Sequence, residues 1–273
     1  MVLVTLHDIL PQARKEKRAV VAFNVANLET LLPVFKAAEQ ENSPLIIQVY
    51  QRLFNDERAS LIAAMTKRLA TDAHIPVALH LDHGVSLEQI REAIALGYTS
   101  VMIDGSQRPF EKNVALTSQA VKIAHDAGVS IEAEIGHVPF GDGTIELSSA
   151  AEAAEFVKRT GVDTLAISIG TMHGFYKKEP KLDIQRAAEI GQSVSIPLVL
   201  HGGTGVSEKQ LKKVIACGVA KVNIATELQS MFLRGVATEL AKNGDKFMPL
   251  DLYFKPVEER IKEYARSKIR AFA

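Results

Sequence analysis

The chain has 273 residues, of which 47% are hydrophobic and 23% are charged. These proportions are typical of a soluble globular protein and exclude a disordered or fibrous one. Lysine plus arginine and aspartate plus glutamate both number 32, so the charge balance does not indicate a nucleic-acid-binding face or a polybasic membrane anchor.

The N-terminal segment, residues 1–17, contains no apolar run long enough for a signal peptide. No later segment approaches the length of a membrane span. We therefore expect a cytoplasmic protein whose partners are small molecules rather than nucleic acid or membrane.

Apolar, strand-like segments then recur at intervals of roughly 25 to 30 residues, with an amphipathic helix between successive ones. Because most of these segments start as continuous apolar runs, we expect a parallel sheet covered on both faces. Eight strands are predicted, at 19–25, 44–50, 76–82, 99–105, 129–135, 163–169, 197–202 and 220–225. Eight strand–helix units predict an α/β fold, a (β/α)8 TIM barrel, as a single domain over residues 1–273.

The predicted helices carry boundary signals. Ser86 and Ser207 are placed as N-caps, and Gly97 and Gly218 as C-terminal stops. An additional C-terminal helical segment, residues 255–272, exceeds the eight-unit count and could pack on the barrel or on a neighbouring subunit, so a homo-oligomer (dimer or tetramer) is an expectation. Cys217 lies in an apolar helical stretch, which favours a buried structural thiol.

Polar residues interrupt the predicted strands near their C-terminal ends. They are Asn24, Asp82, Asp104, Glu132, Glu134, His201 and Asn223. In barrels of this kind the active site is built at that end, whereas the other end serves stability. We therefore expect these side chains to share one site.

Three histidines stand where a strand is expected to give way to a glycine turn: His83 in HLDHG, His173 in TMHG and His201 in LHGG. Three neutral imidazoles are a ligand set for catalytic zinc, with a fourth position open for substrate. Asp82 precedes His83, and neighbouring residues send their side chains in different directions, which favours Asp82 as a general acid/base facing a ligand of the metal. The alternative is a carboxylate that orients a zinc histidine.

Three roles stay open for Asp104 and Glu134. They could stabilise the site electrostatically, hold a second metal position, or bond neighbouring strands. His80 shares a strand face with Asp82, and we expect it to line the barrel.

Glycine-rich turns indicate a phosphate site. GTMHG and HGGTG allow close approach to the backbone, and HGGTG precedes a helix that starts near Ser207. KVNIATEL supplies Asn223 and Thr226 at the next strand end. A phosphate site after strands seven and eight is frequent in such barrels.

Six motifs, in order along the chain, resemble those of class II (zinc-dependent) ketose-bisphosphate aldolases, which include fructose-bisphosphate and tagatose-bisphosphate aldolases. The motifs are HLDHG, SVMIDGS, EAEIG, IGTMHG, PLVLHGGTGV and AKVNIATEL. The match runs through essentially the whole predicted barrel. Ala225 in NIATEL resembles the tagatose-bisphosphate branch more than the fructose-bisphosphate enzymes.

The resemblance implies that His83, His173 and His201 bind one catalytic Zn²⁺, and that Asp82 exchanges the proton of the substrate's C4 hydroxyl. Asn24 matches a position near the substrate, and Asp104 and Glu134 match positions that hold an additional metal ion in some members. The residues that would hold the dihydroxyacetone phosphate part are Gly174, Gly202, Gly203, Thr204, Asn223, Ile224, Ala225 and Thr226. A monovalent cation is a further cofactor that the sequence leaves open.

The expected function is a zinc-dependent aldolase that reversibly cleaves a ketose (bis)phosphate into dihydroxyacetone phosphate and an aldehyde, through a zinc-stabilised enediolate. No lysine is needed for a Schiff base, and Lys221 is expected to start its strand. The alternatives are a non-catalytic sugar-phosphate-binding accessory subunit of the same fold, or an aldolase for a related phosphorylated sugar or sugar acid.

Three segments depart from the family pattern. In residues 137–149 the glutamate that usually serves as loop base for the ketone-side carbon is not identifiable, and Asp142 and Glu146 are candidates for this role. Gln48, Tyr50 and Arg52 stand where the family usually has small residues, at an end expected to contact the aldehyde half or its second phosphate. Arg52 could bind an anion, or it could be a solvated arginine at the start of a helix. SQRPFEKNV lacks the histidine that related enzymes often have at 107 or 108. These departures predict a different aldehyde preference.

Overall fold

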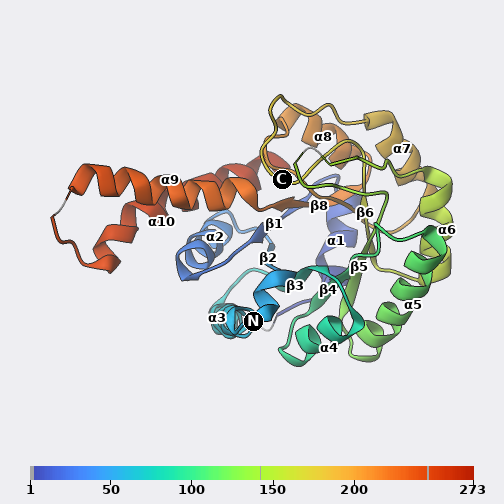
Figure 1. The fold of residues 1–273 in the computed structure, drawn as a ribbon, viewed down its shortest axis with the longest axis horizontal. Helices are drawn as coiled ribbons and strands as arrows, with labels where there is room; N and C mark the ends of the chain where they lie inside the picture. Colours follow the sequence, from blue (N-terminus) through green and yellow to red (C-terminus); the bar gives the residue numbers. More distant parts are fainter. Residues whose placement is uncertain (1–2, 142, 245) are drawn as a thin grey trace.

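Eight parallel strands close into a barrel in a computed structural model, which describes residues 3–141, 143–244 and 246–273 (Figure 1). The strands are β1 (Val20–Asn24), β2 (Leu45–Tyr50), β3 (Val77–Gly84), β4 (Ser100–Ile103), β5 (Ser130–Ile135), β6 (Thr164–Ile167), β7 (Leu198–Leu200) and β8 (Val219–Ile224). Each pairs with the next, and β8 pairs with β1. The predicted TIM barrel is confirmed, and every predicted strand end lies within two residues of the observed one.

Helices cover the outside of the barrel, and the helix α1 (Leu6–Lys15) precedes the first strand. The others are α2 (Leu28–Gln40), α3 (Arg58–Asp72), α4 (Leu87–Ala95), α5 (Phe110–Asp126), α6 (Ala150–Thr160), α7 (Ile184–Ser193), α8 (Glu208–Ala216), α9 (Thr226–Asn243) and α10 (Leu250–Phe272), with a short 3₁₀ helix, η1 (Gln51–Asn55), before α3. None of the described helices is long and apolar enough to cross a membrane.

The predicted helix boundaries are mostly confirmed. The Ser86 hydroxyl accepts a hydrogen bond from the Gln89 amide at 3.2 Å, and Gly97 and Gly218 take positive φ values of 82° and 108° just beyond their helices. Ser207 stands at the N-cap of α8, but its side chain makes no capping bond there. Cys217, at the C-cap of α8, is half-buried rather than fully buried.

The C-terminal helix packs on helices of its own chain. α10 begins at Leu250, five residues before the expected start, and lies along α2 and α9. Figure 1 shows α9 and the first part of α10 reaching outward from the barrel, whereas the C-terminus returns to it. The Ala19 amide donates to the Phe272 carbonyl at 2.9 Å, so the end of α10 is anchored at the start of β1.

The N-terminal helix closes the bottom of the barrel. Leu6 and Leu10 of α1 are fully buried and pack with apolar residues near the strand starts, which are Val20, Ala22, Ile46, Ala78 and Ala220. The Leu6 amide also donates to the Ser130 hydroxyl at 2.9 Å. Because α1 covers this end, ligands reach the barrel interior from the opposite end, where the strands finish.

Leu10→Ala tests this closure. The change leaves a cavity where a fully buried side chain was, so we expect the free energy of unfolding to fall by about 2–5 kcal/mol. Gln12→Ala, on the exposed face of the same helix, is the control and should stay within about 0.5 kcal/mol. Denaturant titration measures both. Equal, small losses would contradict the packing of α1 into the barrel.

Candidate metal and substrate site

The end of β3 departs from regular strand geometry. His83 has a φ of 55°, in the left-handed region, and the pairing of β3 with β4 shifts between Leu81 and Gly84. Neighbouring residues of a regular strand point to opposite faces of the sheet. Here Asp82 and His83 both line one pocket at the mouth of the barrel. The next position, Gly84, requires glycine, because a Cβ there would lie 2.4 Å from the Met102 carbonyl oxygen.

The three histidines singled out in the sequence converge at this mouth. One ring nitrogen from each of His83, His173 and His201 lies within 4.8 Å of the others. The Nδ1 of His201 and the Nε2 of His83 are 2.9 Å apart. The structure therefore brings together a three-imidazole group of the kind that holds a metal ion.

The hydrogen bonds of each ring indicate which nitrogen faces the centre. The partners of the outer nitrogens are Asp104 Oδ2 for His83 Nδ1 at 2.7 Å, Glu132 Oε1 for His201 Nε2 at 2.7 Å, and the Val138 carbonyl for His173 Nδ1 at 3.1 Å. Each outer nitrogen faces an acceptor and must donate to it, so the inner nitrogen of each ring is the one left to bind a metal ion. Metal-binding histidines commonly donate their other N–H to a carboxylate or carbonyl. The donor set therefore fits zinc.

The local charges give the three histidine rings different pKa values. Burial acts to lower the pKa of His83, but the charge of Asp82 and the hydrogen bond to Asp104 outweigh it and raise that pKa to about 10. Burial, together with the positive charge of His83, lowers the pKa of His173 to about 4 and that of His201 well below its ordinary value. One cation is therefore favoured at this point, and it sits on His83 in the absence of a metal ion.

Asp104 and Glu134 form a second group with His83, whose ligand atoms also lie within 4.8 Å of one another. Burial acts to raise the pKa of Asp104, but the hydrogen bond from His83 holds it below its ordinary value. Burial, and then the charge of Asp104, raise the pKa of Glu134 well above the ordinary range. Glu134 Oε2 is buried without a hydrogen-bond partner among the described residues, whereas its Oε1 accepts from the Val138 amide at 3.1 Å. Glu134 therefore offers a free oxygen next to the histidines.

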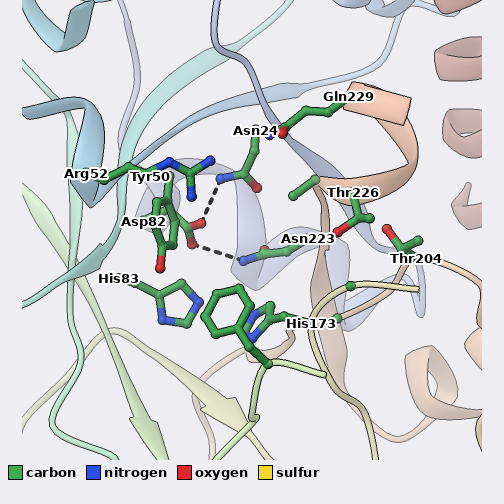
Figure 2. A pocket seen from close by; sticks show the side chains of 14 residues that line it. Asn24, Tyr50, Arg52, Asp82, His83, His173, Thr204, Asn223, Thr226 and Gln229 are labelled. Carbon is green, nitrogen blue, oxygen red and sulfur yellow. Dashed lines mark hydrogen bonds between the residues drawn. The ribbon is translucent and has the colours of Figure 1, made fainter. Parts of the chain in front are cut away.

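Amide side chains hold the Asp82 carboxylate in place. Asn24 of β1 donates to Oδ2 at 2.7 Å, and Asn223 of β8 donates to Oδ1 at 3.3 Å (Figure 2). The Gln48 side chain donates to Oδ1 of the Asn24 side chain at 2.8 Å and so orients that amide. Because both oxygens of Asp82 are supported, the carboxylate faces the pocket in one orientation.

The pocket encloses about 620 Å³, open solvent included. It is lined by Asn24, Tyr50, Arg52, Asp82, His83, Phe140, His173, Gly174, Gly202, Thr204, Asn223, Ala225, Thr226 and Gln229. Figure 2 shows Thr204 and Thr226 at one end, Tyr50 and Arg52 with the neighbouring Asp82 at the other, and Asn223 between the two ends. Most of the residues expected to bind substrate therefore share this cavity.

Two of the expected substrate-binding residues lie outside the lining. The Gly203 amide donates to the Asn223 carbonyl at 3.3 Å, and a Cβ at Gly203 would meet Val222 Cγ1 at 2.6 Å, so this glycine serves close packing against β8. Ile224 is fully buried in the main hydrophobic core. Alternation along β8 explains this, because Asn223 faces inward and its neighbour therefore faces outward.

The loop after β5 covers one histidine. The Phe140 ring stacks on His173 with centroids 4.6 Å apart, and the His173 amide donates to the Pro139 carbonyl at 2.8 Å. Glu146 has an exposed side chain outside the pocket lining, while its backbone pairs with His137. Asp142 lies outside the described residues. No local pattern marks Phe140 as a pocket residue, because its place depends on contact with a distant turn.

A buried ion pair lies beneath the histidines. Lys221 Nζ donates to Glu132 Oε2 at 2.7 Å, both side chains are fully buried, and the other oxygen of Glu132 holds His201. Lys221 lies in the first half of β8, which begins at Val219, so it stands near the start of its strand as expected, and its side chain is buried inside the barrel. His80 lines the interior as expected, with its Nε2 3.4 Å from Lys221 Nζ. A lysine inside an apolar strand was the signal for this pair.

Glu132→Gln tests the ion pair. It leaves the Lys221 charge buried without a partner, so we expect a loss of about 3–5 kcal/mol in the free energy of unfolding. Adding Lys221→Met should recover part of this loss, because the uncompensated charge is removed. Lys122→Met breaks an exposed pair of the same 2.7 Å length and should cost at most about 1 kcal/mol. No recovery in the double variant would contradict the pairing.

Comparison with known proteins agrees with this geometry. The chain is 42% identical over 281 residues to the fructose-bisphosphate aldolase of Staphylococcus epidermidis, covering 100% of this chain and 98% of the relative. It is also 42% identical to the probable fructose-bisphosphate aldolase of Bacillus subtilis over 284 residues, with the same coverage of 100% and 98%. The crystal structure of the YdjI aldolase from Escherichia coli superposes with a TM-score of 0.89 at 36% identity, covering 100% of this chain and 98% of that one. Residues 4–273 match the family model described as fructose-bisphosphate aldolase class-II, and the chain belongs to this family.

Proposed function

We propose that the protein is a zinc-dependent aldolase that reversibly cleaves a ketose phosphate into dihydroxyacetone phosphate and an aldehyde. The observation that carries this proposal is the meeting of three imidazoles and the supported Asp82 carboxylate at one mouth of the barrel. The family to which the chain belongs supports the same reaction. In this proposal residues 1–273 act as one domain.

The ligand atoms would be Nε2 of His83, Nε2 of His173 and Nδ1 of His201, because the opposite nitrogen of each ring is held by an acceptor. A zinc ion held there supplies Lewis-acid stabilisation of the negative charge that develops on the ketone side during cleavage. Glu134, with its free buried oxygen, is the residue we propose for an alternative or second metal position, together with Asp104.

Asp82 would act on the proton of the C4 hydroxyl. Its carboxylate accepts this proton as the bond between C3 and C4 breaks, so the C4 carbon leaves as the aldehyde and the bonding electrons stay with the ketone half. In the reverse direction Asp82 returns the proton to the new hydroxyl. The amides of Asn24 and Asn223 hold the carboxylate oriented for this transfer.

The phosphate of the dihydroxyacetone half would bind at the Thr204 and Thr226 end of the pocket. Gly174 and Gly202 have φ values of 101° and 66°, so both turns depend on glycine. α9 begins at Thr226, and the amides of its first turn have no partner within the helix, which favours an anion there. Thr204 Oγ1 is tied to this turn because it accepts from the Glu227 amide at 3.3 Å.

The accessory-subunit alternative is less well supported. A protein that only binds sugar phosphate needs neither the three converging histidines nor a carboxylate held by two amides, and this structure has both.

The first test is exchange of the hydrogen on the hydroxymethyl carbon of dihydroxyacetone phosphate with deuterated water. Zinc-loaded protein should catalyse this exchange, and a chelator should abolish it. Binding of the ligand without exchange would favour the accessory subunit and overturn the proposal.

Asp82→Asn separates the two halves of the reaction. We expect turnover of ketose bisphosphate cleavage to fall by about 10² to 10⁴, because proton transfer at C4 is lost. Hydrogen exchange on dihydroxyacetone phosphate should fall less, since no C4 hydroxyl takes part. Asp72→Asn, an exposed carboxylate on α3, is the matched control. Equal loss of both activities would contradict the assigned role.

Zinc binding should release protons. The pKa of His83 lies at about 10, so His83 carries its proton at pH 7.5 and loses it only as the pH rises through that value. Zinc must displace this proton, so its affinity should rise about tenfold per pH unit between pH 7 and 9. Calorimetry in buffers of different ionisation enthalpy should give about one proton released per zinc, or about two if Glu134 also binds. Release of none at pH 7.5 would contradict the assignment of His83.

A further inference from the structure

The two ends of the pocket differ in charge. The Thr204 and Thr226 end offers hydroxyl and backbone groups, whereas the opposite end carries the guanidinium of Arg52 beside Tyr50 (Figure 2). Both residues stand where β2 ends and η1 begins. Arg52 is the one arginine or lysine in the pocket lining that the structure describes.

Arg52 is available for a ligand. No carboxylate among the described residues forms an ion pair with it, whereas the nearby Arg58 pairs with Asp56 at 3.3 Å. Asp82, the carboxylate of the same pocket, accepts from Asn24 and Asn223 instead. A guanidinium without an acidic partner is free to bind an anion that enters the pocket.

Tyr50 positions this guanidinium relative to the metal site. The Arg52 guanidinium carbon lies 4.8 Å from the centroid of the Tyr50 ring, a cation–π distance. The same ring meets His83 edge-on at 5.9 Å and Phe140 at 6.4 Å between centroids. Arg52 is therefore stacked on a side chain that itself contacts a candidate zinc ligand.

We propose that Arg52 determines the aldehyde specificity of the enzyme by binding an anionic group, a phosphate or a carboxylate, at the far end of the aldehyde half. This inference rests on the proposed aldolase function. With one phosphate at the Thr204 end and the reacting carbons beside Asp82, the aldehyde half extends toward Tyr50 and Arg52. The planar fork of a guanidinium binds either anion through paired hydrogen bonds.

The test is aldol addition of dihydroxyacetone phosphate, catalysed by the zinc-loaded protein, to three aldehydes. The probes are glyceraldehyde 3-phosphate, succinic semialdehyde and glyceraldehyde, which end in a phosphate, a carboxylate and a neutral group. We expect a higher kcat/KM for at least one charged aldehyde than for glyceraldehyde. The charged aldehyde with the higher kcat/KM shows whether Arg52 binds a phosphate or a carboxylate. Arg52→Met should lower the ratio of charged to neutral kcat/KM by about 100-fold.

Two further variants separate charge from packing. Arg52→Lys keeps the charge but loses the fork, so its ratio should be intermediate. Arg58→Met removes an exposed arginine outside the pocket and should leave the ratio at the wild-type value. A wild-type enzyme without preference for either charged aldehyde, or an Arg52→Met variant with an unchanged ratio, would overturn the inference.

Hydrogen exchange on dihydroxyacetone phosphate keeps the two proposals apart, because it needs no aldehyde. If wild-type protein fails to exchange, the aldolase proposal itself fails. If it exchanges but does not prefer a charged aldehyde, only the role of Arg52 is contradicted.

Discussion

The left-handed backbone of His83, with a φ of 55°, is the constraint on which the site depends. Because the strand bulges there, a candidate zinc ligand and a candidate proton-transfer group come from adjacent positions and face the same pocket. Such a conformation costs on the order of 1–3 kcal/mol for a residue other than glycine. The hydrogen bond from His83 to Asp104 and the close approach of Gly84 to Met102 hold the strand in this shape.

The charges around this bulge form one connected system across the barrel. His83 lies between Asp82 and Asp104, and the neighbouring His201 leads through Glu132 to Lys221. The buried carboxylates Asp82 and Glu132 each have a cationic or amide partner, which is the condition for burying charge at tolerable cost. The barrel interior thus accommodates positive charge on Lys221 and on His83, and a divalent cation at the three histidines would replace the proton on His83.

Sequence patterns predicted the barrel, the meeting of the three histidines and most of the pocket lining. Continuous apolar runs reveal parallel strands, and His83, His173 and His201 are informative because three histidines stand together at strand ends. Gly203 and Ile224 fall outside the pocket because strand alternation places them against the core. The places of Phe140 and Lys221 depend on contacts between distant segments, with His173 and with Glu132. The sequence around Phe140 carries no sign of its contact, whereas a lysine inside an apolar strand indicates a buried partner for Lys221 without identifying Glu132.

The loop after β5 has two roles: it lines the pocket through Phe140, and it supports the ring of His173. The ring of this histidine is held from outside, by the Val138 carbonyl at 3.1 Å and by the stacked Phe140, rather than by the barrel strands. Any movement that lifts this loop removes the support of one ligand at the same moment as it uncovers the pocket. A metal ion held by His173 would therefore lose the support of one of its ligands whenever this loop moved away.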